Sequence, residues 1–300
     1  MELELHENFN FNPLSDHLKQ IGEFNIGSTE LIIVTHNVLN KCTHGEWPDN
    51  AWNIEENDDQ YQARLNLLAA EYALDIKKGA SVIALQEAPR KPIADKFFTQ
   101  IKELSGKDNL GYVINDTADT DEQALMFIYN KQILGECLNS SLILDGHAQS
   151  LKFKLAHQDI EFINIHALYK PDQTKQKEYA DQVMNLMKID NNELKIRIGD
   201  HNANNTYYSD LIVGQSELST SVAYNIKEKC FDFKDQRDGK YKNYDGFAVS
   251  ENISSDSYKI YSEGAMLAVS SNFPKIHILN TPNKGNLRLI NVEAASRINP

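Results

Sequence analysis

A hydrophobic run that ends abruptly in polar residues occupies positions 194–202, which read Leu-Lys-Ile-Arg-Ile-Gly-Asp-His-Asn. Its alternating aliphatic residues predict a strand over Leu194–Gly199. In an extended chain Asp200 and Asn202 point to one side, and His201 points to the other. The strand therefore ends in a carboxylate and an amide that share one direction.

Four other predicted strands carry polar residues in the same way. Polar groups at the ends of buried strands meet at one edge of a sheet, where ligands commonly bind. Each residue taken alone is better explained by a structural role, as a cap, a turn residue or a packed polar group. Five such positions in one chain, however, indicate a functional site. The residues are Asn37 after Leu31–Val34, Glu87 after Val82–Leu85, His166 within Ile160–Leu168 and Asp245 within Tyr244–Val249.

Helical spacing alternates with these strands. Apolar residues recur at helical intervals between Leu65 and Ile76, with Asp58 or Asp59 as the predicted N-cap and Gly79 as the stop. Further helices are predicted for Ile93–Leu104 and Gln173–Met187, and further strands are predicted for Ala124–Tyr129, Leu151–Leu155, Met266–Val269 and Ile276–Leu279.

Many strands joined by a few crossover helices predict one layered α/β domain over residues 30–300. Residues 1–29 are predicted to form a polar lead-in with a short helix near Asp16–Ile21. The 300 residues, 41% of them hydrophobic and 24% charged, suffice for a large core.

The net charge of −13 argues against a broad surface for nucleic-acid backbone, which requires positive charge. Three distant cysteines, Cys42, Cys137 and Cys230, indicate neither a disulfide framework nor a zinc site. The N-terminus lacks the pattern of a cleavable signal peptide, and no apolar run reaches the length of a membrane span. We expect a soluble protein of a reducing, cytoplasmic-type compartment, with signal-independent export left open.

Taken together and in order, six segments resemble the endonuclease/exonuclease/phosphatase superfamily, which has the deoxyribonuclease-I-like fold. The resemblance implies a four-layer α/β sandwich, in which two packed mixed sheets are flanked by helices. It also implies a Mg²⁺-dependent phosphoester hydrolase, with Mn²⁺ as an alternative metal. The segments are Thr35–Leu39, Leu85–Glu87, Ala124–Lys131, Asn164–His166, Gly199–Asn202 and Tyr244–Phe247.

The resemblance assigns a role to each strand-end residue. Glu87 is the implied main metal ligand, with Asn37 beside it, and oxygen ligands of this kind suit Mg²⁺. His166 would hydrogen-bond the phosphate, and Asp200 would orient or deprotonate the attacking water. Asn202 would help to fix the phosphoryl group.

The last motif of the superfamily, Ser-Asp-His-x-Pro, is altered in this chain. Aligned on the proline, Ser270–Pro274 places Ser271 where the aspartate is expected and Asn272 where the histidine is expected. An asparagine cannot act as a general base, and loss of such a group costs ~10²–10⁴ in rate. Asp245, which supports that histidine in the superfamily, would lose its partner.

Three interpretations of this change stay open. The chain is a weakened hydrolase, or a pseudoenzyme that binds a phosphorylated ligand or a protein, or an enzyme in which another histidine substitutes. Rescue by His277 or His201 is disfavoured, because the first lies inside a predicted strand and the second points away from the site.

Substrate signals are weaker. The inositol-lipid phosphatases of the superfamily usually have a Trp before Gly-Asp-x-Asn and an Arg after the late aspartate. This chain has Arg197-Ile198 and Gly246 at those places, which disfavours such a phosphatase. Asn37-Val38-Leu39 instead resembles the deadenylase and nuclease branches. A phosphodiester in nucleic acid or a nucleotide-like ester is therefore the expected substrate. Local basic and aromatic groups would contact it, unless they are solvated or packed: Lys170, Lys175, Lys177, Lys234, Arg237, Lys240, Lys242, Tyr207 and Tyr208.

Overall fold

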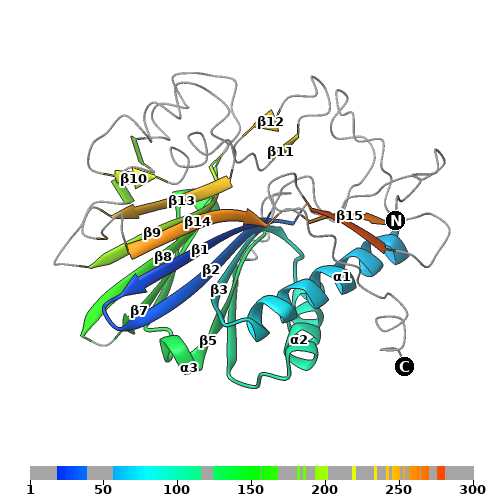
Figure 1. Ribbon diagram of the computed structural model, residues 1–300, viewed down its shortest axis with the longest axis horizontal. Coiled ribbons are helices and arrows are strands. Elements are labelled where there is room, and N and C mark those ends of the chain that lie inside the picture. Colours follow the sequence, from blue (N-terminus) through cyan, green and yellow to red (C-terminus); the bar gives the residue numbers. More distant parts are fainter. Residues whose placement is uncertain are drawn as a thin grey trace.

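Two six-stranded sheets pack face to face in the computed structural model (Figure 1). The structure describes residues 19–38, 57–115, 124–155, 157–167, 181–182, 185–186, 193–201, 218–220, 233–234, 241–242, 245–250, 253, 257–263, 265–269 and 276–280. No helix in these ranges is both long and apolar enough to cross a bilayer.

The first sheet has one parallel pair, β2 with β3, among antiparallel neighbours. Helix α1 (Asp58–Lys77) lies between these two strands in the sequence, as a parallel connection requires. The strand order is β14 (Tyr258–Glu263), β1 (Lys19–Ile26), β2 (Thr29–Asn37), β3 (Ala80–Ala88), β5 (Ala124–Asn130) and β4 (Leu110–Asn115).

The second sheet also has one parallel pair, β8 with β9. Because the carboxyl ends of parallel strands lie at the same sheet edge, each pair brings its last residues together. The strand order is β10 (Leu218–Thr220), β13 (Asp245–Ser250), β9 (Leu194–Asp200), β8 (Gln158–His166), β7 (Ala148–Leu155) and β6 (Asn139–Ile143). Two small antiparallel pairs are β11 (Phe233–Lys234) with β12 (Tyr241–Lys242) and β15 (Ala265–Val269) with β16 (Ile276–Asn280).

The space between the sheets is filled by aliphatic and aromatic side chains. Phe24, Phe127, Phe153, Phe162 and Phe247 are each fully buried there. The rings of Phe153 and Phe162 lie edge to face with their centroids 5.9 Å apart, an arrangement that aromatic pairs favour. Alternation along each strand then decides which residues face this core.

Helices α1 and α2 (Ile93–Ser105) lie side by side against the outer face of the first sheet (Figure 1). A capping box starts α1: the side chain of Asn57 accepts a hydrogen bond from the Gln60 amide, and the Gln60 side chain accepts one from the Asn57 amide. The prediction of Asp58 or Asp59 as the N-cap was therefore wrong by one or two residues. Two short helical turns, α3 (Lys131–Leu134) and η1 (Leu144–Gly146), lie in connections.

The predicted strands and the first two helices are confirmed, but the N-terminal helix was wrong. Lys19–Ile21 belongs to strand β1, which pairs with both β2 and β14. The first sheet thus begins inside the segment that was predicted to be a lead-in. The pairing on both sides satisfies the backbone of β1, and this outweighs local helical spacing. Most of the predicted helix 173–187 lies outside the described residues.

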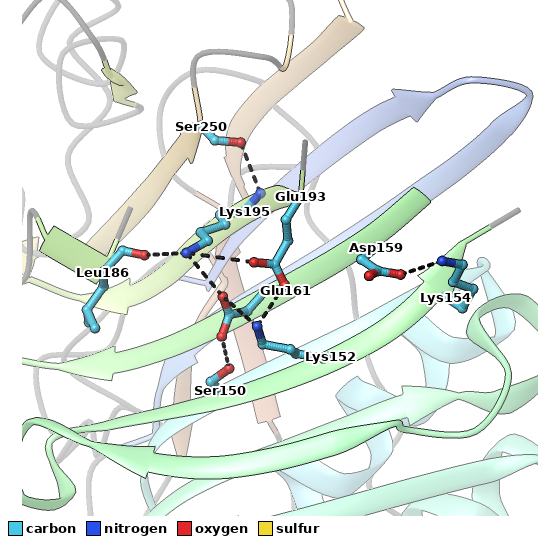
Figure 2. Close-up of polar contacts among 9 residues, drawn as sticks. All are labelled: Ser150, Lys152, Lys154, Asp159, Glu161, Leu186, Glu193, Lys195 and Ser250. Atoms are coloured by element: carbon cyan, nitrogen blue, oxygen red, sulfur yellow. Dashed lines mark hydrogen bonds and ion pairs between the residues drawn. The ribbon is translucent and has the colours of Figure 1, made fainter. Parts of the chain in front are cut away.

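The outer face of the second sheet carries charges that neutralise one another (Figure 2). Glu161 of β8 lies between Lys152 of β7, at 3.8 Å, and Lys195 of β9, at 3.6 Å. Glu193 pairs with Lys152 at 2.8 Å, and Ser150 donates a hydrogen bond to Glu161. These two carboxylates and two ammonium groups balance one another, so this cluster contributes nothing to the acidic surplus of the chain.

A buried cluster joins the start of β1 to α1. The Lys19 ammonium lies 2.8 Å from a carboxylate oxygen of both Glu71 and Asp75. Burial alone would lower the pKa of Lys19, but the two carboxylates outweigh burial and raise it. Burial raises the pKa of Asp75 to about 6, despite the neighbouring ammonium.

We predict that Lys19→Met destabilises the protein by roughly 3–5 kcal/mol, because two carboxylates would lose their buried counter-charge. The free energy of unfolding in guanidinium chloride measures the effect. Lys131→Met is the control, since the ion pair of Lys131 with Glu136 lies at the surface. Equal effects of the two substitutions would contradict the proposed importance of the buried cluster.

Candidate functional site

The site lies where the carboxyl ends of both parallel pairs meet. The Asn37 side-chain amide at the end of β2 donates hydrogen bonds to Glu87 Oε1 of β3 and to Asp200 Oδ2 of β9, both at 3.0 Å. One amide of the first sheet thus bridges carboxylates from the two different sheets. The sequence predicted all three residues, and the structure brings them together.

His166 completes this group from the end of β8. Its Nε2 atom lies 3.7 Å from Glu87 Oε1 and 3.6 Å from Asp200 Oδ2. The side chains of His166 and Glu87 are 15% and 14% exposed, whereas that of Asp200 is 3% exposed. A ligand can therefore reach the histidine and the glutamate, while the aspartate forms the floor of the site.

Glu87 reaches the group through an unusual backbone conformation. Val82, Ala84 and Gln86 face the space between the sheets, so strict alternation would turn Glu87 toward the helices. Instead Glu87 has a φ of 54°, and the pairing of β3 with β5 shifts register between Leu85 and Ala88. A left-handed residue other than glycine costs about 1–3 kcal/mol. This bulge directs the carboxylate toward Asn37.

Asp245 lies at the same edge, on the strand beside Asp200. The two aspartates are direct cross-strand partners of β13 and β9, so their side chains leave the sheet on the same face. Asp245 is fully buried, and its carbonyl accepts a hydrogen bond from the Gln20 side chain at 3.0 Å. The structure therefore places five of the predicted site residues at one edge.

Three predicted residues, Asn202, Ser271 and Asn272, lie outside the described residues. His201 is buried and turned away from the site, as the alternation predicts: its Nε2 accepts a hydrogen bond from Arg197 at 3.0 Å. Burial, and then the charge of Arg197, hold the pKa of His201 well below its usual range. His277 lies in β16, opposite Ala268.

The sequence interpretation missed the polar layer beneath the site. Thr35, Gln86 and Asn164 are fully buried between the sheets. They stand two residues or fewer before a predicted site residue, at inward positions of otherwise apolar strands. That pattern is a usable signal, because a buried amide needs partners close by.

Gly199 allows the two sheets to come together at this point. Its φ is 129°, and a Cβ atom there would lie 2.2 Å from the Ile165 carbonyl oxygen and 2.9 Å from the Gln86 side-chain nitrogen. Only glycine fits such a conformation and such an approach.

The donor set suits a hard divalent cation. Mg²⁺ is usually bound by one or two carboxylates together with water and substrate phosphate, rather than by a cage of protein ligands. The described residues contain no group of three or more His, Cys, Asp or Glu residues arranged to hold a metal. They do offer a partly exposed carboxylate, Glu87, that is oriented by an amide, which fits the Mg²⁺ pattern.

Comparison with known proteins identifies the fold. No protein-family model matches the chain, and no curated protein matches it. The structure of D. rerio TDP2 complexed with a single-strand DNA product matches with a TM-score of 0.50 and 13% identity, covering 77% of this chain and 84% of that chain. An endonuclease/exonuclease/phosphatase family protein from Leptotrichia buccalis C-1013-b matches with a TM-score of 0.49 and 17% identity, covering 72% of this chain and 86% of that chain.

The chain therefore shares the fold of this D. rerio TDP2 structure, and the predicted α/β class with two packed mixed sheets is confirmed. An endonuclease/exonuclease/phosphatase family protein from Bacteroides thetaiotaomicron gives a similar match, with a TM-score of 0.49 and 16% identity over 73% of this chain and 82% of that chain. At these identities the likeness concerns the fold alone.

We predict that His201 makes stability fall below pH 6.5. Because the pKa of His201 is lower in the folded chain, the unfolded chain takes up the proton first as the pH falls, which favours unfolding. The stability that neutral His201 contributes is therefore complete above pH 6.5, the ordinary pKa of histidine. Below pH 6.5 it is lost by at most about 1.4 kcal/mol per pH unit.

Denaturant unfolding of the unaltered protein and of His201→Gln, each at pH 8 and pH 5, measures the effect. Glutamine keeps an acceptor for Arg197 but does not titrate. The variant should lose less stability than the unaltered protein between the two pH values, and an equal loss would contradict the prediction.

Proposed function

We propose that this protein is a divalent-metal-dependent phosphoester hydrolase that cleaves a phosphodiester in nucleic acid or in a nucleotide-like ester. The observation that carries the proposal is the Asn37 amide bridging Glu87 and Asp200, with His166 within 3.7 Å of both carboxylates. The DNA product in the TDP2 structure agrees with a substrate of this class, although it belongs to that protein.

Each side chain has a role that its surroundings support. Glu87 presents a carboxylate to the metal, and the amide of Asn37 fixes the orientation of that carboxylate. A bound Mg²⁺ would polarise a phosphoryl oxygen and offset the negative charge that develops in the transition state. His166 is exposed enough for its Nε2 to donate a hydrogen bond to a phosphate oxygen.

Asp200 is the group that would handle the attacking water. Its Oδ2 accepts a hydrogen bond from Asn37, which leaves the carboxylate fixed at the floor of the site. A fixed carboxylate within hydrogen-bonding reach of a water can orient it and accept its proton. We assign Asn202 to fixing the phosphoryl group. Asp245 would support the residue at position 272, which is Asn272 in this chain in place of the histidine of the superfamily.

The second candidate function is binding without catalysis. Ser271 and Asn272 stand where the superfamily has an aspartate and a histidine. A chain that kept the metal and phosphate groups but lacked this pair would serve as a binding module for a phosphorylated ligand or a protein.

We predict that Glu87→Gln weakens Mg²⁺ binding and hydrolysis at least ~100-fold. Loss of an outer partner of a metal ligand already costs ~10–100-fold, so loss of the ligand should cost no less. Calorimetric titration with Mg²⁺ and hydrolysis of bis(p-nitrophenyl) phosphate and of a single-stranded oligonucleotide measure both effects. Glu103→Gln, an exposed change at the far end of α2, is the control. Equal activity in the two variants would exclude the proposed role of Glu87.

The variant Asn272→His separates the two candidate functions. If the unaltered chain is a weakened hydrolase, restoring the histidine should raise its rate by up to ~10²–10⁴-fold. Metal binding without any hydrolysis in the unaltered chain, with activity only in Asn272→His, would establish the binding module and overturn the hydrolase proposal.

A further inference from the structure

Two buried amides connect the sheets directly beneath Glu87, and we call Gln86 with Asn164 the amide joint. The Gln86 side-chain nitrogen donates to Asn164 Oδ1 at 2.7 Å, to Thr35 Oγ1 at 3.2 Å and to the Ala84 carbonyl at 3.3 Å. The first bond crosses from β3 of the first sheet to β8 of the second. Both side chains are fully buried.

The Asn164 side chain returns two bonds to the first sheet. Its Nδ2 donates to the Leu85 carbonyl at 3.0 Å and to the Met126 carbonyl at 3.3 Å. Leu85 and Met126 are paired residues of β3 and β5, and their register shifts just after this pair. The amide of Asn164 therefore binds the last regular position before the bulge.

These bonds fix the backbone that leads into Glu87. The chain leaves Leu85, passes Gln86 and turns through the left-handed conformation at Glu87. Loss of the bond from Gln86 would leave the buried Asn164 Oδ1 without its partner, and a strained conformation persists only where its surroundings enforce it. Asn164 also shares a strand face with His166, two residues further on.

We infer that Gln86 and Asn164 are positioning residues, which hold the bulge so that the Glu87 carboxylate is presented for metal binding. Neither residue is assigned a contact with metal or substrate. The inference rests on the proposed function, because it assumes that Glu87 binds the metal. It explains why polar side chains occupy the most buried layer between the two sheets.

Gln149 offers a matched comparison within the same layer. It lies opposite Asn164 on β7 and is 2% exposed. Its side-chain oxygen, like that of Gln86, has no hydrogen-bond partner among the described residues, and no hydrogen bond among those residues links Gln149 to β3. Gln86 and Gln149 thus have the same chemistry and similar burial, but only Gln86 is bonded to the segment that carries Glu87.

The test compares Gln86→Met with Gln149→Met in the full chain, with the dissociation constant of Mn²⁺ measured by calorimetry. Gln86→Met should weaken Mn²⁺ binding ~10–100-fold, the usual effect of losing an outer partner of a metal ligand. Gln149→Met should leave the affinity within about twofold of the unaltered chain. Thr35→Val is a milder variant in case Gln86→Met does not fold, and it should weaken binding about 2–10-fold.

Three results would overturn the inference, and they are distinguishable. Unchanged affinity in the folded Gln86→Met or Thr35→Val variant overturns the positioning role alone. Equal losses in Gln86→Met and Gln149→Met show general loosening of the core and also overturn it. Absence of Mn²⁺ binding by the unaltered chain overturns the proposed metal site, and the inference with it.

Discussion

The contact between the two sheets at the ends of their parallel strands is the constraint on which the rest of this structure depends. Gly199 permits the approach, because a Cβ atom there would lie 2.9 Å from the side-chain nitrogen of Gln86 in the other sheet. The Gln86 side-chain nitrogen then donates a hydrogen bond to Asn164 Oδ1 across the gap at 2.7 Å. Away from this point the sheets are held by packing of aliphatic and aromatic side chains, which is non-directional and aligns no polar group.

This contact accounts for the position and the graded exposure of the site. Each sheet contributes one parallel pair, and the strand ends of both pairs meet above the amide joint. Asn37 and Asp200 are buried and bonded to each other, while Glu87 and His166 reach solvent. Such an arrangement combines a fixed floor with an accessible rim. A phosphoester can then reach the rim while the buried carboxylate holds a water in a fixed orientation.

The sequence predicted the central strands of both sheets and the five polar residues that lie together at their ends, because buried strands with polar ends leave strong local patterns. It missed strands at the sheet edges, among them β4, β6 and β14, and it failed where a distant partner decides the conformation. Strand β1 was predicted as part of a lead-in, since its pairing with β14 joins residues more than 200 positions apart. The amide joint was missed because the hydrogen bond between Gln86 and Asn164 forms only when the two sheets pack together. The bulge at Glu87 was missed because simple alternation turns this side chain toward the helices.

The central claim is that the strand ends of both sheets form one metal site at Glu87. Anomalous scattering from a crystal soaked in Mn²⁺ tests it most directly. The account predicts a metal peak about 2.0–2.3 Å from a carboxylate oxygen of Glu87, close to Asn37, with its remaining coordination from water. A crystal without a peak at Glu87, or with its metal bound only elsewhere, would contradict the account.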